Sequence, residues 1–286
     1  MNLETMKRLL ALLGLTLAAV VPPTKAVEGT NPWRFEELSR RPAVEARQGV
    51  AATADALYAI GNHELGKYDR ATGRRLARWE CPEGDPLTHL NAGVVHQGRL
   101  YCAHSNYPGV PMFSSVEIWD TDTLRHVGSH SFGRTDGSLT WFVRRNDRWL
   151  ACFVHYAKRG GEPGRGPEWT RLVEYDDSWR PTGAGWVFPP DLVARLASRG
   201  YSISGGALGP GGHLFVTGHD EPEFYILKFP EAGPALRWVG TVPMTGEGQA
   251  FAWDPVEPGV VHLILKRTRE IITGRVTGPQ PAVKSD

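Results

Sequence analysis

Four histidines and a lysine occupy matching places in five similar segments of the chain. Each follows an apolar run, and the segments read GNHE, AHSN, VHYA, GHDE and LKRT. Imidazoles that converge on one point can hold a transition metal or shuttle protons. The predicted catalytic groups are His104, His155, His219 and Asp220. The predicted ligands for a divalent transition metal (Mn, Fe or Zn) are His63, His104, His155 and His219.

The spacing of these residues also supports a structural role for the histidines. Counted from the aligned apolar residue of each run, His155 and His219 fall five positions on, whereas His104 falls four on and His63 six on. A shift of one residue turns a strand side chain to the opposite face unless a bulge intervenes. The alternative is therefore that the histidines bond loop carbonyls at strand ends.

A second set of polar and aromatic residues lies at the starts of neighbouring runs and in the loops. Amides and an aromatic face around a cavity suit a sugar or another neutral polar ligand. The alternative is that the amides only satisfy neighbouring backbone groups. The predicted substrate-binding residues are Gln48, His89, Asn91, Asn106, Trp141, Tyr156, Gln249 and Lys266.

Units of four short strands must position these residues. Residues 89–132 contain two pairs of alternating runs, separated by the turns HQG and DTDT. A unit of about 45 residues with four strands is the period of a propeller blade. Similar units cover 48–79, 136–188, 201–243 and 246–276.

The last unit has only three strands, and residues 33–47 are available to complete it. A strand from the opposite terminus commonly closes a circular propeller, because closure removes exposed edges. The sequence therefore predicts an all-β fold, a single β-propeller of five four-stranded blades closed by an N-terminal strand. Six blades are the alternative, but the segment 188–201 that would have to supply them reads as a short helix.

Loop lengths differ between the two ends of this propeller. The connections after second and fourth strands lie at one end, and the long ones at 104–115, 156–169 and 188–201 share that end with the histidines. Long loops on one end of a rigid scaffold commonly carry binding and catalysis. We therefore expect a small-molecule ligand in an axial funnel at that end.

Composition and the termini limit the functional classes. Residues 1–26 read as a signal peptide, which predicts a periplasmic or extracellular protein without a membrane span. The propeller domain is expected over 27–276 and a disordered tail over 277–286. A net charge of +1 gives no preference for nucleic acid. The three cysteines contain no CxxC pair, and Cys102 and Cys152 are expected to be buried thiols.

The strand–turn–strand runs SVEIWDTDTLRHVG and LGKYDRATGRRLARW resemble those of the YVTN/NHL-type (quinoprotein-like) β-propeller superfamily. The chain is also similar to small exported bacterial propellers loosely labelled cycloisomerase or phosphotriesterase-like. These resemblances imply a fold and do not specify a reaction. Larger seven-bladed propellers with axial histidines hold iron or manganese, which by analogy implies a metal here.

Two functions follow from these patterns. The first is an exported enzyme of lyase, isomerase or hydrolase type that acts on a small polar or carbohydrate-derived molecule by acid/base or metal-assisted chemistry. The second is a non-catalytic propeller that binds a ligand or a protein partner. Convergent imidazoles would favour the first, whereas a funnel filled by Trp141 and apolar groups would favour the second.

Overall fold

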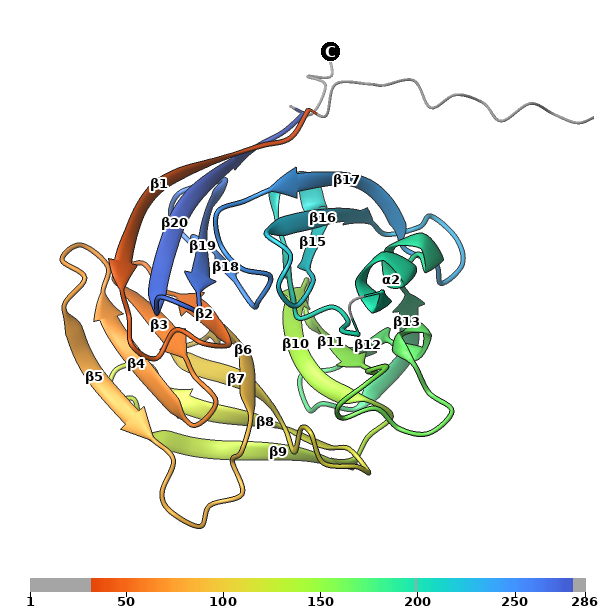
Figure 1. Ribbon diagram of the computed structural model, residues 1–286. Helices are drawn as coiled ribbons and strands as arrows, with labels where there is room; N and C mark the ends of the chain where they lie inside the picture. Colours follow the sequence, from red (N-terminus) through yellow and green to blue (C-terminus); the bar gives the residue numbers. More distant parts are fainter. Residues whose placement is uncertain (1–31, 199, 280–286) are drawn as a thin grey trace, which may run out of the picture. The chain divides into compact units, whose positions relative to one another are not determined.

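A computed structural model describes residues 32–198 and 200–279. Five four-stranded antiparallel sheets are arranged as a ring around an axis (Figure 1). This is a five-bladed β-propeller, as the sequence predicts, and the six-bladed alternative is wrong. The expected signal peptide, residues 1–26, lies outside the described residues.

Each blade begins with its innermost strand and ends with its outermost strand. Blade one contains β2 (Gly49–Ala52), β3 (Ala56–Ile60), β4 (Glu64–Asp69) and β5 (Arg75–Glu80). Blade two contains β6 (Leu90–His96), β7 (Arg99–Ser105), β8 (Phe113–Asp120) and β9 (His126–Arg134). Blade three contains β10 (Ser138–Arg145), β11 (Arg148–Val154), β12 (Arg171–Tyr175) and β13 (Pro181–Val187). Blade four contains β14 (Gly205–Leu208), β15 (Leu214–Thr217), β16 (Glu223–Lys228) and β17 (Arg237–Pro243).

Blade five is assembled from both ends of the described chain. It contains β18 (Ala252–Trp253), β19 (Val260–Leu265), β20 (Glu270–Thr277) and β1 (Arg34–Pro42). Strand β1 pairs antiparallel with β20, from Arg34 opposite Thr277 to Pro42 opposite Glu270. The expected closure is therefore confirmed, and Thr277 belongs to a strand rather than to the predicted tail.

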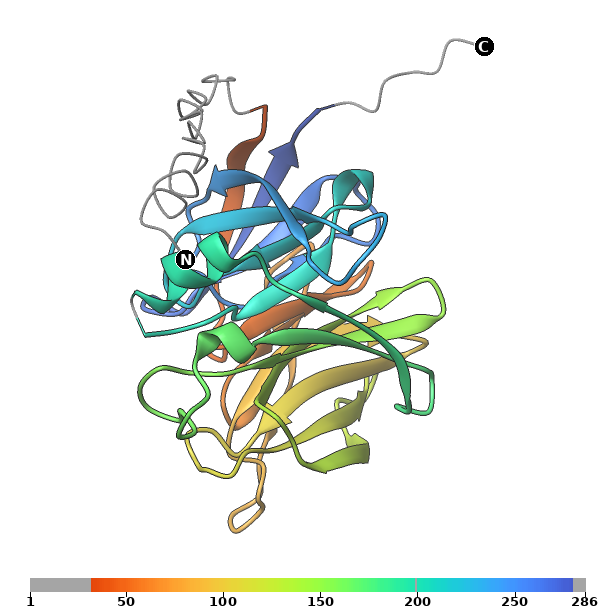
Figure 2. The same ribbon diagram turned by 90° about the vertical axis from the view of Figure 1, so that its right-hand side faces the viewer.

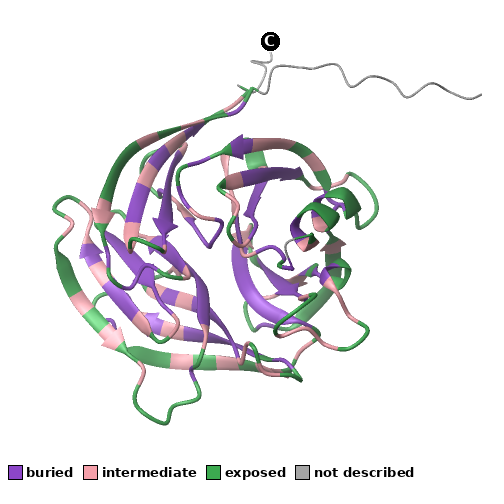
Figure 3. Ribbon diagram, viewed as in Figure 1, coloured by how far each residue is buried: buried purple, intermediate pink, exposed green. Residues whose placement is uncertain are grey.

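Burial decreases from the axis outward (Figure 3). Inner strand β10 is almost wholly buried, whereas every residue of the outer strand β13 is at least partly exposed. Figure 2 shows the strands in side view, with the short helix α2 (Pro190–Ala197) packed beside blade four. This helix was predicted, and it buries Leu192 and Leu196. Cys102 and Cys152 are buried free thiols, as expected.

Turn chemistry explains why the strands end where they do. Asp69 Oδ1 accepts hydrogen bonds from the backbone N–H and the hydroxyl of Thr72, at 2.6 and 2.7 Å. Asp120 does the same with Thr123, at 2.9 and 2.8 Å. Such turns let a short polar side chain replace ladder hydrogen bonds.

No helix in the part of the chain described here is long and apolar enough to span a membrane.

Candidate axial site

His89 lies at the centre of an imidazole group at the end of the ring where the inner strands begin. It directly precedes the inner strand β6. Burial lowers the pKa of His89 to about 4, with further lowering from His104, His63 and His219. His89 is therefore neutral at physiological pH, and each ring nitrogen has a single role as donor or acceptor.

Tyrosine rings surround this imidazole group. The centroid of Tyr107 lies 5.0 Å from that of His89 and 4.9 Å from that of Tyr156. Tyr201 stacks on His219 at a centroid distance of 3.9 Å and an interplanar angle of 9°. Tyr107, Tyr156 and His219 are partly exposed, and Tyr201 is exposed. These rings provide an aromatic surface with polar edges.

His219 is the histidine whose contacts best suit acid/base chemistry. Its Nδ1 lies 2.8 Å from Oδ2 of Asp220, and Lys266 Nζ pairs with the other oxygen of this carboxylate. Burial lowers the pKa of His219, and the Asp220 carboxylate opposes that shift. The contact between the two side chains is an ion-pair distance without the alignment of a hydrogen bond, since the buried Nδ1 has no hydrogen-bond partner within the described ranges. A proton on Nδ1 that turned toward the carboxylate would leave Nε2 as a base. The sequence predicted all three residues, and the structure brings them together.

His104 instead has both ring nitrogens engaged inside blade two. The backbone N–H of Thr88 donates to its Nε2 at 3.2 Å, so the ring proton lies on Nδ1, 2.8 Å from Ser115 Oγ. Ser115 in turn donates to Glu117 Oε1 at 2.6 Å. Burial lowers the pKa of this histidine. His104 is thus a fixed, neutral member of a hydrogen-bonded chain rather than a free ligand or base.

Three further predicted site residues have surroundings other than the axial imidazole group. His155 is 3% exposed, and its charged neighbours are Glu162, Arg165 and Arg171. Trp141 is fully buried in the core between blades three and four, so it does not face a ligand. Asn106 accepts a bond from the backbone of Phe113 at 2.8 Å and thereby holds its own loop.

The predicted amides serve the backbone and one another. Gln249 Nε2 donates to the carbonyl of His219 at 2.7 Å, and Gln48 Nε2 donates to Asn62 Oδ1 at 2.5 Å. Gln249 therefore positions the backbone of His219. Asn91 is 6% exposed, and its buried Nδ2 has no partner in the described part of the molecule. The indole N–H groups of Trp141 and Trp253 on two other inner strands are likewise without a partner among the described residues.

The predicted four-histidine metal centre is not assembled. Among residues 32–198 and 200–279, no three His, Cys, Asp or Glu side chains are grouped so that they could hold a metal ion. His63 is exposed, with Nδ1 3.2 Å from the carbonyl of Leu87. His104 is engaged at both nitrogens, and His155 lies elsewhere. The residues present therefore do not fit the ligand set that the spacing suggested.

The inner strands pack closely beside one another near the histidines and enclose a hollow at the other end of the ring. A Cβ atom at Gly49 would lie 2.7 Å from Cβ of Ala250, so the inner strands of the neighbouring blades one and five pack closely side by side there. At the opposite mouth, a cavity of about 300 Å³ is lined by all five inner strands, including Ala51, Gly206 and Trp253.

Sequence reasoning missed Tyr107, Tyr201 and the Ser115–Glu117 pair. Tyr107 lies in the long loop 104–115, whose length was noticed although its aromatic residue was not. Tyr201 directly follows the helical segment and could have been found by the same argument. Ser115 and Glu117 alternate along β8, which places both on the face occupied by His104.

The comparisons with known proteins bear on the fold. No protein-family model matches the sequence, and no curated protein matches it. A luciferin-regenerating enzyme is similar in structure, with a TM-score of 0.52 and 13% identity over 85% of this chain and 95% of that one.

Two other solved structures are more weakly similar. The WD40 repeats of RRP9 have a TM-score of 0.44 at 8% identity, over 80% of this chain and 79% of that one. U3-55K has a TM-score of 0.41 at 10% identity, over 85% of this chain and 98% of that one. At such identities a structural likeness shows the fold alone. The chain is thus similar to known β-propellers in architecture.

Proposed function

We propose that this chain is an exported β-propeller enzyme that moves a proton on a small polar, carbohydrate-derived molecule at its axial face. The observation that carries the proposal is the His219–Asp220 pair, whose Nδ1 and carboxylate oxygen lie 2.8 Å apart, within ion-pair distance although Nδ1 makes no hydrogen bond among the described residues. A small rotation that aligns Nδ1–H with this carboxylate would leave Nε2 as the general base that a proton transfer needs. Isomerase and lyase reactions that begin by removing a proton next to a carbonyl need such a base.

The surroundings of His219 fit the same chemistry. The neutral His89 and the rim tyrosines Tyr107 and Tyr201 offer hydrogen bonds and aromatic faces of the kind that bind sugars. Lys266 supplies a positive charge beside Asp220 that would attract an oxyanion. We place the chain in the YVTN/NHL-type superfamily as part of this proposal, on its turn chemistry.

Exchange of protons with solvent tests the proposal without knowledge of the product. The protein would be incubated in D₂O with a panel of aldoses, ketoses, sugar lactones and uronic acids, and deuterium incorporation would be followed by NMR. We expect incorporation at the carbon next to a carbonyl in one class. His219→Gln should reduce the rate by about 10²–10⁴-fold, whereas the control His155→Gln should leave it unchanged.

The second candidate is a binding propeller without catalysis. The observation that favours it is His104, a predicted catalytic residue whose two ring nitrogens are both engaged in hydrogen bonds inside blade two. The same panel separates the two functions. A sugar that raises the melting temperature without acquiring deuterium would support binding alone and would contradict the enzyme.

A further inference from the structure

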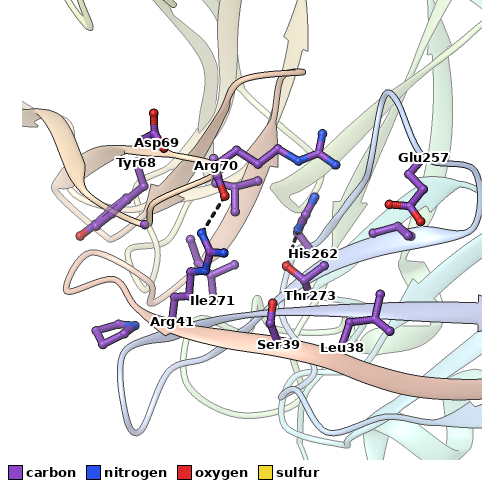
Figure 4. A pocket seen from close by; sticks show the side chains of 14 residues that line it. Leu38, Ser39, Arg41, Tyr68, Asp69, Arg70, Glu257, His262, Ile271 and Thr273 are labelled. Atoms are coloured by element: carbon purple, nitrogen blue, oxygen red, sulfur yellow. Dashed lines mark hydrogen bonds between the residues drawn. The ribbon is translucent and has the colours of Figure 1, made fainter.

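A separate cavity of about 160 Å³ lies between blade five and blade one (Figure 4). One wall is a row of side chains across blade five, since Ser39 pairs with Thr273 and Thr273 pairs with His262. The other wall includes Leu57 and Arg70 of blade one. The volume is below the 300–1,000 Å³ or so of drug-sized sites, so only a small molecule fits.

Buried hydrogen bonds fix the polar groups on the back wall. His262 is 1% exposed, with Nε2 2.9 Å from Asp254 Oδ2 and Nδ1 3.0 Å from Thr273 Oγ1. Arg70 also pairs with Asp254, at 2.5 Å. Burial lowers the pKa of His262, so its single proton faces the carboxylate and Nδ1 accepts from the Thr273 hydroxyl. The oxygen of Thr273 is left with lone pairs as an acceptor.

The carboxylates around the cavity already have partners. Asp254 is held by Arg70, by His262 and by two backbone N–H groups. Glu257 pairs with Arg275, and Asp69 accepts two bonds from Thr72.

The donors on strand β1 are less satisfied. Arg41 donates through Nη1 to the carbonyl of Arg70 at 2.6 Å, and within residues 32–198 and 200–279 no carboxylate lies within ion-pair distance of it. Ser39 is exposed at the mouth of the cavity, and its hydroxyl makes no hydrogen bond to the protein in the same ranges. A guanidinium and a hydroxyl therefore remain to bind an oxyanion.

We propose that this cavity is a second ligand site that takes a small hydroxy acid, with its carboxylate on Arg41 and Ser39 and its hydroxyl donating to Thr273 Oγ1. The aliphatic side chains of Leu57, Val260 and Ile271 line the remaining surface, which suits a short carbon skeleton. The ligand would bridge β1 to blades five and one. It is unrelated to the sugar proposed for the axial face.

Calorimetry with sodium lactate, propionate and lactamide tests the site. Lactate should bind and raise the melting temperature, because only the folded ring has the cavity. Lactamide, which lacks the charge, should bind about 10–100-fold more weakly, and propionate, which lacks the hydroxyl, about 2–10-fold more weakly. Equal affinities for lactate and lactamide, or no binding of lactate, would overturn the proposal.

Two variants and a control locate the binding. Arg41→Gln should reduce lactate affinity at least about tenfold. Ser39→Val removes an unpartnered hydroxyl and fills space without touching the Arg70–Asp254 pair, so it should fold normally and also lose binding. Arg74→Gln removes an exposed charge from the nearby turn and should bind lactate like the native protein. Undiminished binding by Ser39→Val would refute the location.

Discussion

His89 differs in pKa between the folded and unfolded chain, from about 4 to about 6.5. Between these values the unfolded chain binds a proton that the folded chain does not. The contribution of neutral His89 to the free energy of unfolding is therefore complete above about pH 6.5 and is lost as the pH falls toward 4. The shift corresponds to at most about 3 kcal/mol.

Urea denaturation at pH 7 and pH 4.5 measures this effect. His89→Gln should lose less stability between the two pH values than the native chain does. Tyr107→Phe keeps a ring against position 89 and should retain the native difference. If His89→Gln and the native chain lose the same free energy, His89 is not the residue responsible.

Gly206 lies against the buried Trp141 ring, and this contact predicts the effect of a substitution on stability. A Cβ atom there would lie 2.6 Å from the Trp141 ring, which is fully buried and has no room to move. Overpacking of this kind costs about 1–3 kcal/mol, so Gly206→Ala should lower the free energy of unfolding by that amount. In the control Gly128→Ala, the nearest atom lies 3.7 Å away. Unchanged stability of Gly206→Ala would contradict this prediction and would mean that blades three and four can move apart enough to accommodate the methyl group.

At the scale of elements, blade boundaries were predictable because each strand is short and bounded by its own turn chemistry. The turns at Asp69 and Asp120 show that chemistry directly. Side-chain direction was less predictable. The inner strands carry register shifts between Leu90 and Gly93 and between Leu139 and Trp141. Such a bulge reorients the following residues, so a period of two could not place Trp141.

The residues at the ends of the second strands also show that sequence spacing does not predict side-chain direction. Lys266 and His219, which share a spacing, meet through Asp220. His155 has that spacing too, yet its charged neighbours are two residues of the loop that follows it and Arg171 at the start of β12. Equivalent spacing therefore predicts an equivalent strand position but not a shared pocket. The loop that follows each strand decides where the imidazole points.

At the scale of the whole ring, the closing strand β1 determines whether blade five is complete. It supplies the outer edge of that blade and places Trp33 in the core beside Phe215, at a centroid distance of 5.3 Å. Without β1, strand β20 becomes an unpaired edge, which favours aggregation. The Arg70–Asp254 pair links blades five and one independently, but loss of a buried tryptophan alone costs about 3–5 kcal/mol.

Deletion of residues 1–42 should therefore abolish the cooperative unfolding transition and produce aggregates in size-exclusion chromatography. Deletion of residues 1–26, the expected signal peptide, is the control and should leave a folded monomeric propeller. A synthetic peptide of residues 33–42 added in trans should restore the transition in the longer deletion, because it can pair with β20 by strand addition. A longer deletion that unfolds at the control's melting temperature would show that four complete blades and an open fifth suffice. Rescue by the peptide would instead show that closure is a pairing step that does not require chain continuity between β1 and β2.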